Sequence, residues 1–272
     1  MDETWLGRLR VDVGEMVREQ FDYRELLYRL TARDLLLRYK QTAMGFAWAV
    51  FMPLVNTAIF SVIFTRVARV DTGGIPYPLY AFCGLLAWNL FAATLRTSVA
   101  SLTTNVTLVT KVYFPREIFP FSALIVSLVD SAVASLVLVG LMAYYRVGVT
   151  PAVLLLPALV VVQGCFTAGV ALVLAMANLF YRDVKYLFEV VIVAWMFATS
   201  VLYPVSLVGG RAGMLLRLNP MTPIVDAYRS VLLRGQLPPF GPYAAAAGVS
   251  VLVLVAAWTV FHRAEFTFAE NI

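Results

Sequence analysis

Charged residues are scarce in this sequence. Asp, Glu, Lys and Arg make up 14% of its 272 residues, whereas a soluble domain carries about 25%. Hydrophobic residues account for 61%, and so much apolar surface has to face lipid or neighbouring membrane helices. The hydrophilic stretches are too short for a separate domain, which needs at least about 50 residues. We therefore expect a cytoplasmic amphipathic segment over 1–42 and one membrane domain over 43–272.

The residues on which enzymes and metal sites depend are also few. The sequence has one histidine, His262, and two cysteines, Cys83 and Cys165. Both cysteines fall in apolar segments, where we interpret them as small buried side chains and not as a disulfide or a metal site. A G-x-x-x-x-G-K phosphate loop, a metal-ligand spacing and a nucleophile–base pair are all missing from the sequence. We expect no catalytic residue, no metal and no cofactor on this chain.

Long uncharged runs are what the sequence has instead. One of them, from Ala152 to Tyr181, extends over 30 residues, and a helix needs about 20 apolar residues to cross a bilayer. The runs predict an all-α integral membrane protein with six transmembrane helices. The predicted spans are 43–66, 77–100, 119–145, 151–179, 186–205 and 243–262.

The distribution of positive charge predicts the orientation. An even number of spans places both termini on one side, and 14 of the 21 Lys and Arg residues lie inside if that side is the cytoplasm. We therefore expect a multi-pass protein of the cytoplasmic membrane. The net charge of +5 follows this topology, so we expect membrane lipids and no nucleic acid as partners.

The N-terminal segment is predicted to form two helices. The first is amphipathic, which is typical of a helix lying along the membrane surface. The second runs from about 23 to 40. In the simplest interpretation this segment only anchors the chain to the membrane surface. In a more specific interpretation it also transmits force from a partner protein. The apolar face of the first helix contains Leu9, Val13, Met16 and Val17.

Two connecting segments do not resemble plain loops. The inner loop 101–120 predicts a short helix across 105–113, which is either a docking element for a cytosolic partner or a positively charged anchor. The outer segment 204–242 is too apolar for a solvated loop. Within it, Thr222-Pro223 indicates a helix start, and Gly235 followed by two prolines indicates its end. We expect short re-entrant helices dipping into the outer leaflet, with a surface connector as the alternative.

One carboxylate falls inside a predicted span. Asp130 lies near the middle of the third span, and a carboxylate at that depth is expensive and indicates a functional role. Arg96, near the inner end of the second span, is one candidate partner. A neutral or hydrogen-bonded structural aspartate at a helix contact is equally compatible with the sequence.

Five segments, in register along nearly the whole chain, resemble the membrane subunits of ABC-2-type polysaccharide exporters, the permeases for O-antigen, teichoic acid and capsule-type polymers. The five segments are RYKQTAMGFAWAVFMPL (38–54), YAFCGLLAWNLF (80–91), KVYFPREIFP (111–120), NLFYRDVKY (178–186) and NPMTPIVDAYRSVLL (219–233). The resemblance implies a homodimer bound to two copies of a cytosolic ATPase, which would hold ATP and Mg²⁺. It also implies a lipid-linked polysaccharide as substrate.

The resemblance further implies roles for particular residues. Coupling to the ATPase would involve Asn105, Lys111, Arg116 and Glu117. The outer gate would contain Pro204, Pro223, Asp226 and Arg229. The basic residues Arg38, Lys40 and Arg96 would attract the diphosphate of the lipid carrier. Three alternatives remain open: an ABC-2 exporter of drugs or lipids, an ion-coupled carrier working without an ATPase, and a scaffold without a transport role.

Overall fold

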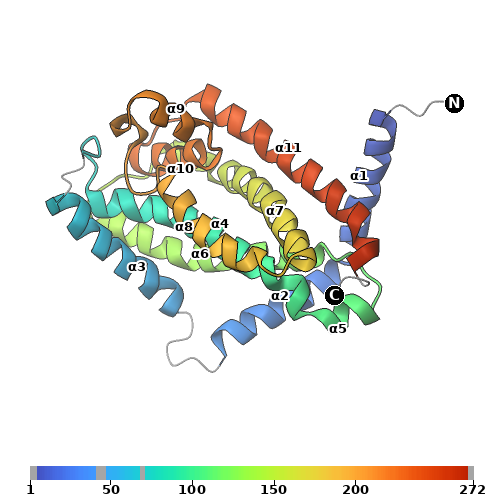
Figure 1. The fold of residues 1–272 in the computed structure, drawn as a ribbon. Helices are drawn as coiled ribbons and strands as arrows, with labels where there is room; N and C mark the ends of the chain where they lie inside the picture. Colours follow the sequence, from blue (N-terminus) through green and yellow to red (C-terminus); the bar gives the residue numbers. More distant parts are fainter. Residues whose placement is uncertain (1–4, 41–46, 68–70, 269–272) are drawn as a thin grey trace.

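A computed structural model describes residues 5–40, 47–67 and 71–268 of the chain. Every regular element in these ranges is a helix, so the predicted all-α class is confirmed for the described residues. Helices α4, α6, α7 and α11 form the body of the molecule, and α1, α2 and α5 lie at one of its ends (Figure 1). We call this end the α5 end, and we call the opposite end, where α9 and α10 lie, the α10 end.

Four helices are long and apolar enough to cross a bilayer. They are α4 (Tyr77–Thr104), α6 (Ile118–Tyr144), α7 (Leu156–Phe180) and α11 (Phe240–Ala264). Each has 25 or more residues, which corresponds to about 37 Å or more at 1.5 Å per residue. They confirm the second, third, fourth and sixth predicted spans.

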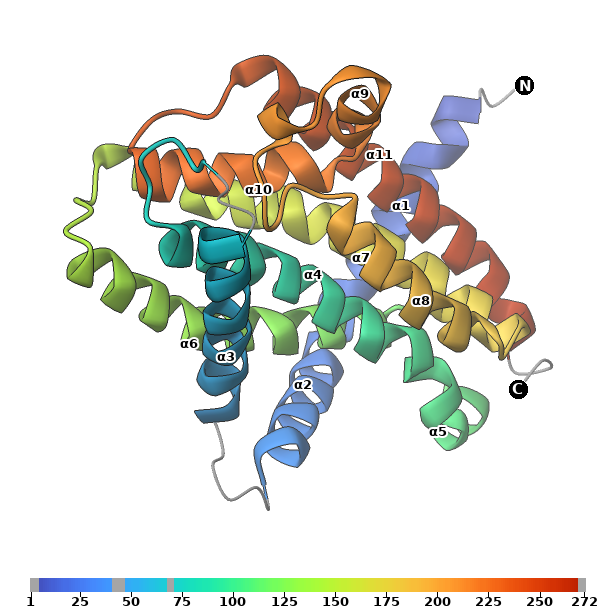
Figure 2. The same cartoon turned by 60° about the vertical axis from the view of Figure 1, so that its left-hand side comes forward.

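Helix α4 is the central helix of the bundle. It packs against α6, α7, α3 and α10, and these neighbours surround it in Figure 2. Its side chains are mostly buried, whereas large parts of α6 and α11 are exposed. A helix that is apolar all round belongs inside a bundle or a membrane. Residues of α4 therefore line the cavities that lie between the helices.

The fifth predicted span is shorter in the structure, and the first is described only from residue 47 onward. Helix α3 (Ala47–Val62) continues as a π-helix, η1 (Ile63–Val67), and residues 43–46 of the predicted span lie outside the described ranges. Helix α8 (Val184–Phe197) has 14 residues, about 21 Å, where the sequence predicted a helix to residue 205. The six-span count therefore stays a prediction.

The two N-terminal helices are α1 (Trp5–Asp22) and α2 (Arg24–Tyr39), and the predicted second helix is confirmed. Helix α1 packs against α11, and α2 packs against α6. Met16 of α1 is fully buried. The side chains before Gly14 lie outside the description, so the amphipathic face predicted for Leu9 and Val13 is not tested.

The short elements lie at the two ends of the bundle. At the α5 end are α5 (Val106–Lys111) and η5 (Glu265–Thr267). Toward the α10 end, α10 (Met221–Arg229) continues as a π-helix that stops at Gly235, whose φ is +64°. This left-handed conformation favours glycine, and it confirms the predicted helix end. The remaining short elements are η2 (Pro151–Leu155), η3 (Val205–Leu207), α9 (Gly210–Leu218) and the π-helix η4 (Ser230–Arg234).

Candidate functional site

A groove that contains charged side chains lies between α2, α3, α4 and α6. Its volume is about 420 Å³. Apolar and aromatic residues make up much of the wall, and polar groups converge inside it. The lining residues that the argument uses are Arg38, Tyr39, Trp48, Asn56, Arg96 and Asp130. The sequence had singled out three of these separately as charged groups, and the fold brings them into one groove.

Asp130 is paired with Arg38 and not with Arg96. The Arg38 guanidinium donates from Nη1 to one carboxylate oxygen, and the Tyr39 hydroxyl donates to the other. Arg38 also donates from Nη2 to the hydroxyl of Thr97, at 3.3 Å. The expectation of Arg96 as partner is thus corrected, because Arg38 holds the Asp130 carboxylate and Arg96 pairs with Glu189 of α8 instead. Burial, and the carboxylate beside it, raise the pKa of the Tyr39 hydroxyl, which therefore stays a donor.

The other two basic residues of the predicted anion site are more exposed. Arg96 forms an ion pair with Glu189 of α8, with 3.3 Å between Nε and Oε2 and with about half of each side chain exposed. An exposed pair of this kind contributes about 0–1 kcal/mol, so it holds Arg96 weakly. Lys40 is exposed at the end of α2 and does not line the groove.

Toward the α10 end, Arg229 of α10 is buried, with 1% of its side chain exposed. Its guanidinium donates to the backbone carbonyls of Ser200 and Val201. It also forms an ion pair of 3.1 Å with Asp226 and stacks on the Tyr80 ring of α4, 3.6 Å from the ring centroid. The Arg229 side chain therefore points into the protein, whereas 42% of the Asp226 side chain is exposed.

These contacts account for the early end of α8. The last carbonyls of a helix have no partner within the helix, and inside a membrane protein such groups need side-chain partners. Asn219 donates to the Ala198 carbonyl at 2.8 Å, and the Tyr77 hydroxyl donates to the Leu202 carbonyl at 2.9 Å. Together with Arg229 they satisfy the backbone after Phe197, so the chain can leave the helix and continue through the buried residues 199–202.

The two prolines of the predicted outer gate are partly buried. Pro204 precedes the short helix η3, and its carbonyl accepts a hydrogen bond of 3.1 Å from the Leu207 N–H. Pro223 is in the first turn of α10, where its missing N–H costs no helical hydrogen bond. Both residues fix backbone direction and have no chemical group of their own to offer.

At the α5 end, the four residues of the predicted coupling set separate into two groups. Asn105 precedes α5 and accepts a hydrogen bond of 3.2 Å from Arg33 of α2, and Lys111 is exposed at the end of α5. Arg116 and Glu117 are buried instead. The Glu117 carboxylate contacts His262 at 3.0 Å and accepts from the Trp258 indole at 3.2 Å. The sequence predicted that all four residues lie on one exposed surface. In the structure, Arg116 and Glu117 instead contact residues in the last turns of α11 and in η5.

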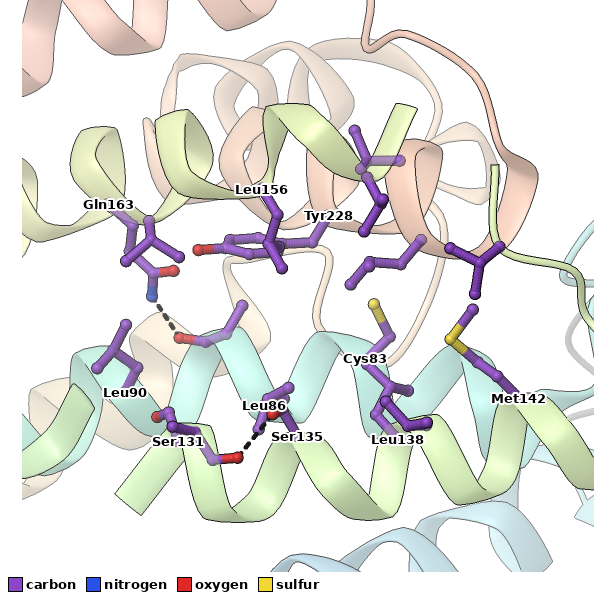
Figure 3. A pocket seen from close by; sticks show the side chains of 18 of the residues that line it. Cys83, Leu86, Leu90, Ser131, Ser135, Leu138, Met142, Leu156, Gln163 and Tyr228 are labelled. Carbon is purple, nitrogen blue, oxygen red and sulfur yellow. Dashed lines mark hydrogen bonds between the residues drawn. The ribbon is translucent and has the colours of Figure 1, made fainter. Parts of the chain in front are cut away.

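A second cavity, of about 390 Å³, lies between α4, α6, α7 and the π-helix after α10. Gln163 and Tyr228 point into it from one side, and Ser131 and Ser135 lie across from them (Figure 3). The Gln163 amide donates to the Ala87 carbonyl at 2.6 Å. All the described residues that line this cavity are uncharged, in contrast to the groove, so it offers no cationic side chain to an anion.

Taken together, several bilayer-length apolar helices, a charged groove among them and a helix end followed by a buried segment with capped carbonyls define a multi-pass membrane protein. Residues 25–233 match the family of ABC-2 type transporters, and the chain belongs to that family. The resemblance predicted from the five segments is confirmed. The protein is thus a membrane subunit of a transporter and not an enzyme.

Curated relatives cover nearly the whole chain. The O-antigen export system permease protein RfbA of Myxococcus xanthus is 32% identical over 260 residues, which are 94% of this chain and 99% of the relative. A protein of the same name from Klebsiella pneumoniae is 27% identical over 250 residues, or 90% of this chain and 94% of the relative. A second Klebsiella pneumoniae protein of that name is 26% identical over 251 residues, with the same two coverages.

Proposed function

We propose that this chain is the permease subunit of an ATP-driven exporter that moves a lipid-linked polysaccharide, of the O-antigen or teichoic acid type, across the cytoplasmic membrane. The observation that carries the proposal is the similarity to the Myxococcus xanthus O-antigen export permease over 99% of that protein's length. The proposed assembly is a homodimer with two copies of a cytosolic ATPase. Both termini and the α5 end face the cytoplasm, and the α10 end faces outward, with α9 and α10 as re-entrant helices.

The proposed coupling route begins at α5. Lys111 at its end and Tyr113 just after it are exposed, the latter by 72%, and this surface is available to the ATPase. Movement of α5 is transmitted to α2 through the hydrogen bond between Asn105 and Arg33. Arg38, about 1.4 turns further along α2, is bonded to Asp130 of α6, so displacement of α5 reaches the groove in the membrane domain.

The groove between α2, α3, α4 and α6 is proposed to receive the diphosphate of the lipid carrier. Arg38 and Arg96 both line it, and an arginine binds phosphate oxygens through a planar fork of N–H donors. Binding would require the diphosphate to compete with Asp130 for Arg38. Lys40 would add long-range attraction from the surface without entering the groove.

Deletion of the gene in its host tests the proposal. We expect surface polysaccharide to disappear and the lipid-linked polymer to accumulate inside the cell, because synthesis continues while export stops. A strain with the ATPase inactivated is the matched control and should have the same phenotype. Unchanged surface polysaccharide, together with an altered resistance to drugs, would instead favour an exporter of drugs or lipids.

Reconstitution separates an ATP-driven exporter from an ion-coupled carrier. The purified chain in proteoliposomes should move no substrate under a proton or sodium gradient, and transport should require the ATPase and ATP. Gradient-driven transport by the chain alone would contradict the proposal. Cross-linking of the purified protein, followed by mass determination, tests the homodimer directly.

A further inference from the structure

The α5 end contains a buried cluster of three residues that the coupling route does not use. Glu117 lies just before α6, His262 lies near the end of α11, and Glu265 lies in η5. One nitrogen or oxygen atom from each of them lies within 4.8 Å of the other two. Glu117 and Glu265 are buried, and His262 is 17% exposed. The sequence separates the two glutamates by 148 positions, so only the fold brings them together.

We propose that Glu117, His262 and Glu265 bind a divalent transition-metal ion of the zinc type. Zinc takes imidazole and carboxylate ligands at about 2.0–2.2 Å in tetrahedral geometry, which puts neighbouring ligand atoms about 3.3–3.6 Å apart. The His262 Nδ1 atom lies 3.0 Å from Glu117 Oε1 and 3.8 Å from Glu265 Oε1. These two distances lie on either side of the tetrahedral value, so shifts of a few tenths of an ångström would bring His262 to that spacing from both carboxylates, and the ligand atoms of the two glutamates lie within 4.8 Å of each other.

Two further features of the cluster are typical of metal sites. Ligating carboxylates are usually held by hydrogen bonds from a second layer of groups, and both glutamates are held in this way. The Trp258 indole donates to Glu117 at 3.2 Å, and the Arg116 backbone N–H donates to Glu265 at 3.3 Å. The Oε2 atom of Glu117 is buried and has no hydrogen-bond partner in the described part of the chain. A carboxylate oxygen left without a partner at a buried position is an available ligand.

The local charge also favours a divalent cation. Glu19 of α1 lies close enough for its charge to act on both Glu117 and His262. A metal-bound imidazole is neutral, so Glu19, Glu117 and Glu265 bring three carboxylates to the region of the site. The Arg116 guanidinium, which donates to the Val109 carbonyl, offsets part of their negative charge, and a divalent ion would offset more of it. The bound ion would join the start of α6 to the end of α11, directly behind α5, whatever substrate the transporter moves.

Cobalt binding to the purified full-length protein tests the proposal. His262 is the only histidine in the sequence, so a purification tag without histidine leaves one imidazole in the sample. We expect one Co²⁺ per chain at micromolar concentration, with the visible absorption bands of a tetrahedral site, and displacement by Zn²⁺. Addition of Zn²⁺ should also raise the unfolding temperature. Failure of the wild-type protein to bind either ion at micromolar concentration would overturn the proposal.

Substitutions then assign the ligands. His262→Gln and Glu117→Gln should each reduce affinity at least tenfold, whereas Glu189→Gln, which changes an exposed glutamate elsewhere, should leave it unchanged. His262→Cys should restore binding and add a near-ultraviolet charge-transfer band from the thiolate. If His262→Gln binds Co²⁺ with the wild-type spectrum and affinity, the ion lies elsewhere and the assignment is wrong. Gel filtration of each variant establishes that the protein is folded before binding is measured.

Discussion

The guanidinium of Arg229 lies 3.6 Å from the centroid of the Tyr80 ring, although the two residues belong to different helices. The same guanidinium donates to two carbonyls of the segment that follows α8. One buried side chain thus connects α10, α4 and the end of α8. A buried cation is tolerated only when it is paired and hydrogen-bonded, and this one has an ion pair, two carbonyls and an aromatic face as partners.

Arg229→Ala should destabilise the protein strongly. The substitution leaves the Ser200 and Val201 carbonyls without donors, and each unsatisfied buried group costs about 1–3 kcal/mol. We therefore expect the free energy of unfolding to fall by about 2–5 kcal/mol, measured by denaturant unfolding in detergent. Arg217→Ala, at an exposed position of α9, is the control and should change it by less than about 0.5 kcal/mol. Equal effects of the two substitutions would show that the contacts of Arg229 contribute nothing.

Gly84→Ala should also destabilise this junction. A Cβ atom on Gly84 would overlap both the Arg229 guanidinium and the Val201 carbonyl, so α4 and the segment after α8 would have to separate. The matched control is Gly140→Ala in α6, where a Cβ atom meets nothing within 4 Å. Because alanine is favoured over glycine in helices by about 1 kcal/mol, we expect Gly140→Ala to be neutral or stabilising. Thermal unfolding of both variants checks this, and the idea of a close approach fails if Gly84→Ala is equally well tolerated.

The ion pair between Arg38 and Asp130 should contribute more to the free energy of unfolding than the pair between Arg96 and Glu189. The first is partly buried and shares its carboxylate with Tyr39, whereas both side chains of the second are about half exposed. Exposed pairs contribute about 0–1 kcal/mol, and breaking a buried pair costs about 3–5 kcal/mol. A double-mutant cycle for each pair, using Ala and Asn or Gln replacements, measures the two coupling energies. We expect the Arg38–Asp130 coupling energy to exceed 1 kcal/mol, and a value no larger than that of the exposed pair would contradict it.

Lys111→Glu should uncouple ATP hydrolysis from export without destabilising the protein. Lys111 is exposed at the end of α5, so reversing its charge alters the surface offered to the ATPase and little else. Glu117→Gln changes a buried carboxylate and should lower the unfolding temperature as well as export. Parallel measurements of ATPase activity, export and unfolding temperature distinguish the two. Normal export by the Lys111→Glu protein would argue against a coupling role for this residue.

The boundaries of the long helices could be predicted from the sequence because hydrophobicity is a local property. The runs over 77–100, 119–145 and 151–179 lie within or close to α4, α6 and α7, and Gly235 ends the helix after Thr222 because only glycine readily adopts a positive φ. The early end of α8 could not be predicted in this way. Its uncharged run continues past Phe197, and the groups that satisfy the broken backbone come from Tyr77, Asn219 and Arg229, which are distant in sequence.

The candidate sites show the same difference between local features, which the sequence predicted, and contacts between distant residues, which it did not. The sequence identified Asp130 as unusual because a charge near the membrane interior is costly wherever it occurs, and the resemblance to the exporter family drew attention to Arg38 and Arg96. It did not identify the pairing of Asp130 with Arg38, which lies 92 positions away, or the contributions of Tyr39 and Thr97. It also treated Arg116 and Glu117 as surface residues, because nothing in the local pattern reveals that the end of α11 covers them.

The amino-acid sequence by itself determined that this is a helical membrane protein of the ABC-2 type, because apolar run lengths and motif order are written along the chain. Only the tertiary structure decided which charges meet, where α8 stops and that Glu117, His262 and Glu265 share one buried cluster. The physical reason is that the free-energy cost of burying a polar or charged side chain depends on that residue alone. Which partner offsets the cost depends on how helices distant in sequence pack together.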